Sequence, residues 1–174
     1  MDCYVDADFA GLWNIEDSED PSCVKSRTGY FITLAGCPMI WGSKLQQMVA
    51  LSTTEAEYLA LSYAMRQFLP AKALVQSVLA HIDKKFEGAI IKSTAFEDNQ
   101  SCIATAKSKK ISPRTKHIDT HVHFFRSHIH DENDNPDGDI RIEYIDTKVQ
   151  PADMLTKSLG FEQFVKLRKI AFGW

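Results

Sequence analysis

The chain has 174 residues, of which 44% are hydrophobic and 25% charged, with a formal net charge of -3. These values fit one globular domain over residues 1–174 and exclude a disordered tail or a fibre. No stretch approaches the ~18 continuous apolar residues of a membrane span and the N-terminus lacks a secretory signal, so we expect a cytoplasmic or nuclear protein that is neither secreted nor membrane-bound.

The first part of the chain predicts three strands in an antiparallel meander. In the first strand, the alternation places Val5 and Ala7 on one face and Asp6 on the other. Polar residues over 14–22 indicate a loop, and residues 35–38 indicate a turn. The expected strands cover residues 3–9, 29–34 and 39–43.

An amphipathic helix is expected after this meander. Ser52, Thr53 and Glu55 are typical of a helix start, because hydroxyls and acids cap the first turn. Glu57 shares one helical face with apolar residues, whereas Glu55 lies about 200° around the axis and should be solvated. Pro70 should kink or divide the helix, with a second amphipathic piece reaching about residue 81. The apolar face contains Ala60, Leu61, Ala64 and Phe68.

The second half of the chain predicts strands alternating with helices. A strand over 89–96 leads into a short helix that ends near residue 107. The further expected elements are a loop over 108–113, a helix over 115–130, a loop over 131–138, a strand over 139–145, a helix opened by Pro151 and a last helix over 161–172. The order β-β-β-α-β-α-α-β-α-α indicates an α/β fold in which helices cover the faces of a mixed sheet.

The chain has four cysteines, and none of them forms a C-x-x-C pair or a zinc-type spacing. We therefore expect free, mostly buried thiols in a reducing compartment. They are Cys3, Cys23, Cys37 and Cys102.

Four carboxylates are the candidate site residues, although each also has an ordinary structural explanation. Asp6 lies within a strand, where Asp is disfavoured. Asp98 ends a strand and opens a helix, as an N-cap would, and Asp153 follows Pro151 in a first helical turn. Together with Glu57, these acids suit a two-metal site that cleaves a phosphodiester, because hard divalent cations prefer carboxylate oxygens.

Seven segments connect the chain with a known family, and they run in family order along nearly its whole length. They are Tyr-Val-Asp-Ala-Asp-Phe-Ala-Gly (4–11), Ser-Arg-Thr-Gly-Tyr (26–30), Ile-Trp-Gly-Ser-Lys (40–44), Val-Ala-Leu-Ser-Thr-Thr-Glu-Ala-Glu-Tyr (49–58), Glu-Asp-Asn-Gln-Ser (97–101), Arg-Thr-Lys-His-Ile-Asp (114–119) and Gln-Pro-Ala-Asp-Met-Leu-Thr-Lys (150–157). On these segments the chain resembles the ribonuclease H domain at the C-terminal end of copia-type (Pseudoviridae) retrotransposon polyproteins.

The resemblance implies a ribonuclease H-like fold with a five-stranded mixed sheet, and a metal-dependent endonuclease that hydrolyses the RNA strand of RNA–DNA hybrids. It assigns catalysis and metal binding to Asp6, Glu57, Asp98 and Asp153, with Asp8 a helper at most. It also implies two Mg²⁺ ions, which Mn²⁺ can replace, and a linked or neighbouring reverse transcriptase domain. Virus-like particles become one expected location within the cytoplasm.

A histidine found in many cellular ribonucleases H is absent. It lies in the loop before the helix that carries the fourth acid, and here that loop, residues 146–150, contains none. His117 is the tentative catalytic replacement, with Lys148 as the alternative. Zinc binding by His117 and His121 is disfavoured, because Ile118 stands where a zinc helix usually carries its Glu.

Two sets of residues are expected to contact the substrate. A basic segment would bind phosphates in a salt-dependent manner, although a solvated loop is the alternative explanation. It contains Lys107, Lys109, Lys110, Arg114 and Lys116. Four polar residues near the acids have donors and acceptors suited to RNA 2′-hydroxyls. They are Ser52, Thr53, Asn99 and Gln100.

Two other functions stay open. A catalytically silent hybrid-binding or structural module of a polyprotein would keep the fold without cleavage. A DNA-acting relative, such as an integrase or transposase, would usually carry its catalytic Glu on a late helix, whereas Glu57 lies on the helix after the third strand.

Overall fold

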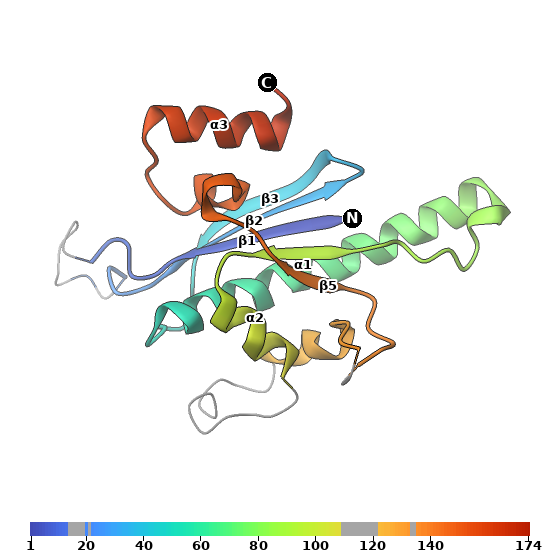
Figure 1. Cartoon of the computed structure of the whole chain (residues 1–174), viewed down its shortest axis with the longest axis horizontal. Coiled ribbons are helices and arrows are strands. Elements are labelled where there is room, and N and C mark those ends of the chain that lie inside the picture. Colours follow the sequence, from blue (N-terminus) through green and yellow to red (C-terminus); the bar gives the residue numbers. More distant parts are fainter. Residues whose placement is uncertain (14–19, 21, 109–121, 133–134) are drawn as a thin grey trace.

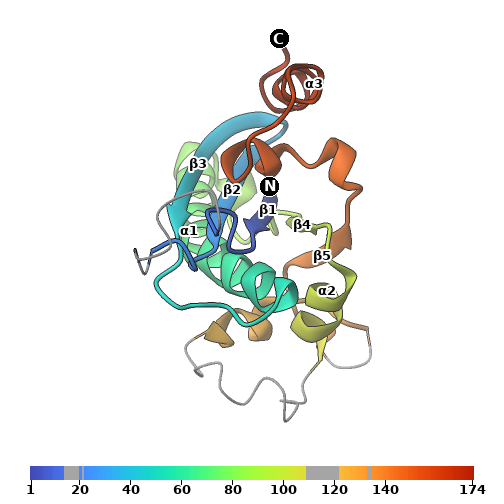
Figure 2. The ribbon, with the colours of Figure 1, turned by 90° about the vertical axis from the view of Figure 1, so that its left-hand side faces the viewer.

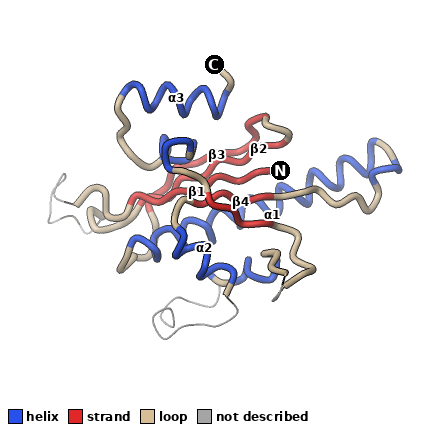
Figure 3. The backbone as a smooth tube through the Cα atoms, viewed as in Figure 1, coloured by secondary structure: helices blue, strands red, loops and turns tan. Residues whose placement is uncertain are grey.

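The computed structural model describes residues 1–13, 20, 22–108, 122–132 and 135–174. The strands within these residues are β1 (Asp2–Asp8), β2 (Arg27–Leu34), β3 (Cys37–Leu45), β4 (Thr94–Glu97) and β5 (Arg141–Tyr144). They form one sheet in the order β3-β2-β1-β4-β5 (Figures 1 and 3). The first three strands pair antiparallel, and β4 runs parallel to both β1 and β5, so the sheet is mixed as expected.

Helices cover both faces of the sheet. On one face, α1 (Thr53–Ile82) packs against β1 and β2. On the other face, η6 (Pro151–Leu155) contacts the same two strands, and α3 (Phe161–Phe172) lies beyond it (Figure 2). The other described helices are η1 (Lys84–Phe86), α2 (Gln100–Lys107), η4 (Phe124–His128) and η5 (Thr147–Val149). This α/β architecture agrees with the expected ribonuclease H-like fold.

The side chains of β1 alternate between an apolar face in the core and a second face that carries the candidate metal ligand Asp6. Val5 and Ala7 are buried among apolar side chains that include those of α1, and full burial of one large apolar side chain contributes roughly 1.5–3 kcal/mol. Tyr4 points to the other face, where its ring stacks on that of Phe96 at a centroid distance of 4.9 Å. Asp6 shares the face of Tyr4, because successive strand residues alternate. The alternation predicted for this strand is confirmed.

One glycine lets η6 approach the sheet beside Asp6. Gly29 is the antiparallel partner of Asp6 in β2. A Cβ at this position would lie 2.6 Å from Thr156 Cγ2 and 2.9 Å from the Ala152 carbonyl oxygen. Any larger side chain would therefore push η6 away from the acid that it faces.

The prediction that Pro70 divides the first helix is wrong, because α1 runs unbroken through it. Pro70 is exposed, and so is Arg66, whose carbonyl lies one turn before it. The carbonyl that loses its helical N–H partner can therefore be hydrated, which lowers the cost of the proline.

Three other predicted elements differ in the structure. The strand expected over 89–96 begins only at Thr94, because β1 offers it no partner before that residue. The helix expected over 115–130 lies partly outside the described residues, and its described end forms the 3-10 helix η4 followed by a bridge from Ile129 to Ile140. The helix opened by Pro151 is also a 3-10 helix, which ends as the chain turns toward Asp6.

The expected state of the cysteines is confirmed. All four lie in described segments as free thiols, of which Cys3, Cys23 and Cys102 are buried and Cys37 is exposed. In the described part of the chain, every helix is too short or too polar to cross a membrane.

Candidate metal centre

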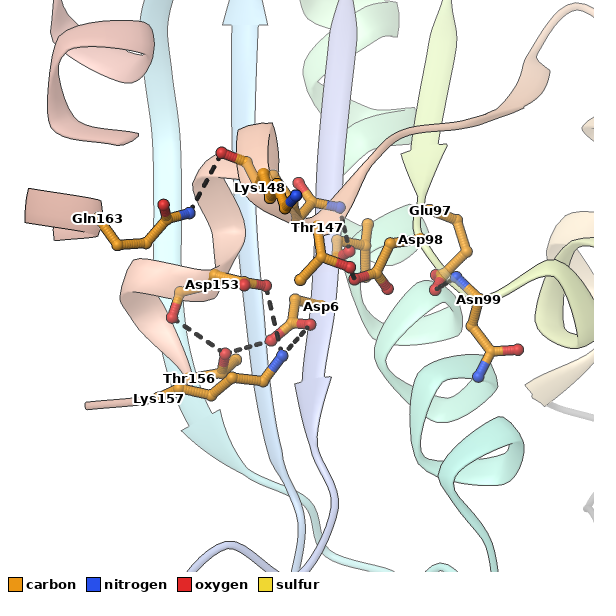
Figure 4. Close-up of polar contacts among 12 residues, drawn as sticks. Asp6, Glu97, Asp98, Asn99, Thr147, Lys148, Asp153, Thr156, Lys157 and Gln163 are labelled. Atoms are coloured by element: carbon orange, nitrogen blue, oxygen red, sulfur yellow. Dashed lines mark hydrogen bonds and ion pairs between the residues drawn. The ribbon is translucent and has the colours of Figure 1, made fainter. Parts of the chain in front are cut away.

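Asp6 lies in the middle of the sheet and is fully buried. Two neighbours from the C-terminal part of the chain compensate its carboxylate (Figure 4). The Thr156 hydroxyl donates a hydrogen bond to Oδ2, and Lys157 Nζ lies 2.9 Å from Oδ1. A buried carboxylate requires such partners, because an uncompensated charge in a dry environment is strongly unfavourable.

Asp98 directly follows β4. Its carboxylate accepts a hydrogen bond from the loop over residues 146–150, which lacks the expected histidine. Thr147 in η5 donates its hydroxyl hydrogen bond to Asp98 Oδ2 at 2.7 Å (Figure 4). In the same loop, Lys148 is exposed and its backbone N–H donates to Asp146 Oδ1. The loop therefore contributes a hydroxyl to the acidic cluster.

Asp153 is the third residue of η6 and is 3% exposed. Its carbonyl oxygen accepts from the backbone N–H groups of Thr156 and Lys157 at 3.2 and 3.1 Å. Its carboxylate Oδ1 also lies 3.4 Å from Lys157 Nζ. One short turn thus presents both Asp153 and the two residues that contact Asp6.

The acids form two groups that share one member. Ligand oxygens of Asp6, Asp98 and Asp153 all lie within 4.8 Å of one another, and the same holds for Glu57, Glu97 and Asp98. Asp98 lies between the groups, at the end of β4, with Asp6 on one side and Glu97 on the other (Figure 4). Either cluster could bind a metal ion, since carboxylate oxygens are the ligands that hard cations prefer.

Burial and mutual repulsion raise the pKa values of Glu57 and Asp153. Burial, then the charges of Glu97 and Asp6, raise the pKa of Glu57 to about 11. Burial, then the charge of Asp6, raise the pKa of Asp153 to about 7. Burial lowers the pKa of Lys157, but the Asp6 carboxylate outweighs it and raises that pKa above its usual range. The cluster is therefore short of positive charge, which a cation would supply.

Gln150 connects the strands that carry the acids. It is fully buried, and its Nε2 donates to the carbonyl of Val5 at 2.8 Å and to that of Phe96 at 3.4 Å. These carbonyls immediately precede Asp6 in β1 and Glu97 in β4. The Gln150 amide therefore fixes the separation of the two strands where the acids begin.

Two of the four residues predicted to contact 2′-hydroxyls, Ser52 and Asn99, are helix caps. Ser52 Oγ accepts from the Glu55 N–H at 3.1 Å, and Asn99 Oδ1 accepts from the Cys102 N–H at 3.0 Å. Thr53 and Gln100 are exposed. Asn99 follows Asp98 directly and Ser52 caps the helix of Glu57, so all four lie near the acids in the chain.

The prediction that Glu55 is solvated is wrong. Glu55 is 7% exposed, and its Oε2 accepts the Leu51 N–H at 2.9 Å. A first-turn acid that folds back over the helix start satisfies a backbone donor, and this local bond outweighs the tendency of that face to be hydrated.

The tentative catalytic His117 lies outside the described residues. Lys107 is the last residue of α2, and the other four basic residues also lie outside the described residues. They are Lys109, Lys110, Arg114 and Lys116. His121 is also outside them, so the zinc alternative stays untested. The described residues on either side are Ser108 and Val122.

Several residues of this centre were not singled out by the sequence analysis. Lys157 follows Asp153 by four positions, and Thr156 by three, which is the spacing of neighbours on one helical turn. Glu97 alternates with buried Ala95 in a strand, a pattern that predicts an inward side chain. Thr147 and Gln150 carry no comparable signal, because their partners are more than forty positions away in the chain.

No family model matches the chain. It is 37% identical over 161 residues to the Retrovirus-related Pol polyprotein from transposon TNT 1-94 of Nicotiana tabacum, a match that covers 92% of this chain and 10% of that protein. Homologues of this chain include retrovirus-related Pol polyproteins from plant transposons.

Two polyproteins of Arabidopsis thaliana extend this comparison. The chain is 27% identical over 164 residues to the Pol polyprotein from transposon RE1 and 28% identical over 160 residues to that from transposon RE2. These matches cover 94% and 92% of the chain, and 10% of each relative. The chain thus spans about a tenth of the length of these relatives.

Proposed function

We propose that this chain is a metal-dependent endonuclease that hydrolyses the RNA strand of RNA–DNA hybrids, as the ribonuclease H domain of a copia-type retrotransposon polyprotein. The observation that carries the proposal is the approach of Asp6, Asp98 and Asp153 to within 4.8 Å from three separate elements. The ordered family motifs and the similarity to Pol polyproteins support the same reading. Cleavage would leave 3′-hydroxyl and 5′-phosphate ends.

The donor set fits two divalent cations. It consists of carboxylates, and the buried Oε2 of Glu57 has no hydrogen-bond partner among the described residues. Asp6, Glu57, Asp98 and Asp153 would be the ligands of two Mg²⁺ ions, with Mn²⁺ as a substitute. When bound, the two ions would stabilise charge on the attacking and leaving oxygens of the phosphodiester.

The chain's own residues would orient this ligand set. Thr156 holds Asp6 in one position, and Thr147 holds Asp98. Such supporting contacts matter, because loss of a residue that orients a metal ligand typically reduces affinity or activity about 10–100-fold.

Substrate contacts would come from two sets of residues. Lys109, Lys110, Arg114 and Lys116 would bind phosphates of the hybrid, and His117 would act at the substrate phosphate or in product release. Ser52, Thr53, Asn99 and Gln100 would contact the RNA strand through its 2′-hydroxyls. A linked reverse transcriptase domain would supply further affinity, in agreement with the polyprotein context of the relatives.

The test is cleavage of an end-labelled RNA–DNA hybrid with Mg²⁺, using Asp98→Asn and the exposed control Asp137→Asn. Asp98→Asn should lose at least roughly 100-fold in rate, because it removes a proposed ligand rather than a supporting contact, while hybrid binding in EDTA stays unchanged. Asp137→Asn should cleave like the unmodified chain. Full cleavage by Asp98→Asn would contradict the proposal.

The same assay separates the alternative functions. A catalytically silent module of a polyprotein would bind the hybrid and leave it intact with or without Mg²⁺. An integrase-like or transposase-like activity would process a DNA duplex offered in place of the hybrid.

A further inference from the structure

Glu97 is a buried acid that the four-carboxylate motif does not include. It is the last residue of β4 and is completely inaccessible to solvent. The parallel register pairs Cys3 with Ala95, so Ala95 and Glu97 point to the face of the sheet that α1 covers. Glu97 thus faces Glu57 on α1, whereas Asp6 points to the opposite face.

Only one of the two carboxylate oxygens of Glu97 accepts a hydrogen bond from a neighbouring backbone group. Oε1 accepts the Asn99 N–H at 3.2 Å, at the start of α2 (Figure 4). Oε2 is buried and has no hydrogen-bond partner among the described residues, and the same is true of Glu57 Oε2. Ligand oxygens of both acids lie within 4.8 Å of each other and of Asp98.

A cap for α2 does not account for this arrangement. An amide would accept the Asn99 N–H equally well and would avoid a second buried negative charge. Glu57 and Glu97 instead bring two carboxyl groups together in a buried space, where like charges without a counter-ion are unfavourable. Glu57 Oε2 and Glu97 Oε2 thus lie beside Asp98 without a hydrogen-bond partner among the described residues.

We propose that Glu57, Glu97 and Asp98 form a divalent-cation subsite, in which Glu97 supplies a carboxylate oxygen beyond the four-acid set. The inference rests on the proposed metal centre, because Asp98 belongs to both groups of acids. The three carboxylates favour a hard cation such as Mg²⁺ or Mn²⁺. The subsite would therefore bind its ion on the α1 side of Asp98.

The experiment compares Glu97→Gln with the unmodified chain and with Glu55→Gln, using Mn²⁺ alone as the probe. Glu55 is a matched control, because it is a buried acid on the same helix as Glu57 and its oxygen accepts a backbone N–H. Calorimetry measures the number of bound Mn²⁺ ions and their affinity. Thermal unfolding is recorded in EDTA and in saturating Mn²⁺.

The two measurements should change in opposite directions in Glu97→Gln. Its melting temperature in EDTA should equal or exceed that of the unmodified chain, since the amide keeps the bond to Asn99 and removes charge repulsion. The affinity of one Mn²⁺ ion should fall at least about tenfold, and the Mn²⁺-induced rise in melting temperature should shrink. Glu55→Gln should bind Mn²⁺ like the unmodified chain.

A purely structural role for Glu97 predicts different results. Glu97→Gln would then melt lower, or fail to fold, in EDTA, or would bind Mn²⁺ with unchanged affinity, and any of these would overturn the inference. An Asp6→Asn variant separates the two proposals. If Asp6→Asn loses Mn²⁺ but Glu97→Gln does not, only the Glu97 subsite fails, whereas an unmodified chain that binds no Mn²⁺ refutes both.

Discussion

Lys157 Nζ lies 2.9 Å from Asp6 Oδ1, so an ammonium group rests against a carboxylate that has no solvent exposure. The same nitrogen lies 3.4 Å from Asp153 Oδ1. Lys157 therefore occupies a position between two acids that are also candidate metal ligands. Its single charge partly compensates them, and a divalent cation would compete for the same oxygens.

Replacing Lys157 by Met should weaken the metal-free protein and strengthen metal binding. Loss of the ammonium leaves Asp6 with one partner, which should lower the free energy of unfolding in EDTA by about 1–3 kcal/mol. Removal of a nearby positive charge should also raise the affinity for Mn²⁺. Urea denaturation in EDTA and calorimetric titration with Mn²⁺ measure the two effects.

The control for this prediction is Lys166→Met, which removes an exposed lysine of α3. It should change neither quantity, because exposed charges contribute little to stability. A Lys157→Met protein that is as stable in EDTA as the unmodified chain would show that the ion pair with Asp6 does not stabilise the fold.

The metal-free protein should become less stable as the pH rises toward neutrality. The pKa of Asp153 is raised from 3.8 to about 7 in the folded chain. Between these values the folded state holds a proton that the unfolded chain has released, so the free energy of unfolding falls with rising pH. Glu57, whose pKa is raised to about 11, extends the decline above neutrality.

Thermal unfolding in EDTA between about pH 5 and pH 8 tests this dependence. Asp153→Asn should flatten the decline below about pH 7 and leave the part due to Glu57, because the amide does not titrate. Parallel curves for the two proteins would contradict the raised pKa of Asp153. Saturating Mn²⁺ should remove most of the decline, since bound ligands are deprotonated at all these pH values.

The residues of the centre differ in how far local sequence specifies them. Helical periodicity predicted that Glu57 faces inward, and the structure places it there because α1 lies on the sheet along that face. Periodicity failed for Glu55, since one bond to the Leu51 N–H reverses its expected exposure. Helical periodicity therefore predicts whether a side chain points inward or outward, unless that side chain forms a hydrogen bond with a nearby backbone group.

Long-range contacts within the centre could not be read from the chain. Glu97 meets Glu57 only because β4 pairs parallel with β1 in a register that the sequence does not encode locally. Thr147 meets Asp98 across 49 positions because β5, which precedes Thr147, pairs with β4, which precedes Asp98. The family segment 150–157 contains Gln150 and Lys157 but assigns them no role, and Thr147 lies outside it, so the contacts of these residues emerge only from the fold.

Thiol reagents should distinguish one cysteine from the other three. Cys37 is exposed, whereas Cys3, Cys23 and Cys102 are buried. Burial also raises the pKa values of the Cys3 and Cys102 thiols, which suppresses the reactive thiolate. We expect one thiol to react rapidly with a disulfide reagent in the folded protein, and four in urea. Rapid reaction of a thiol in folded Cys37→Ser would contradict this.

Gln150→Leu should damage both the fold and the metal centre. The apolar side chain keeps the approximate volume but leaves the carbonyls of Val5 and Phe96 without the Nε2 donor, at a cost of about 1–3 kcal/mol in unfolding free energy. Because those carbonyls precede Asp6 and Glu97, the separation of the acids should also become less fixed. Mn²⁺ affinity should then fall about tenfold or more.

Gln163→Leu is the matched control, since its exposed Nε2 donates to the Lys148 carbonyl outside the acidic cluster. It should lose little stability and no Mn²⁺ affinity, because water can replace the lost donor. Urea denaturation and Mn²⁺ calorimetry on both variants separate the two roles of Gln150. A Gln150→Leu protein that is destabilised but binds Mn²⁺ normally would mean that the amide joins β1 to β4 without positioning the acids.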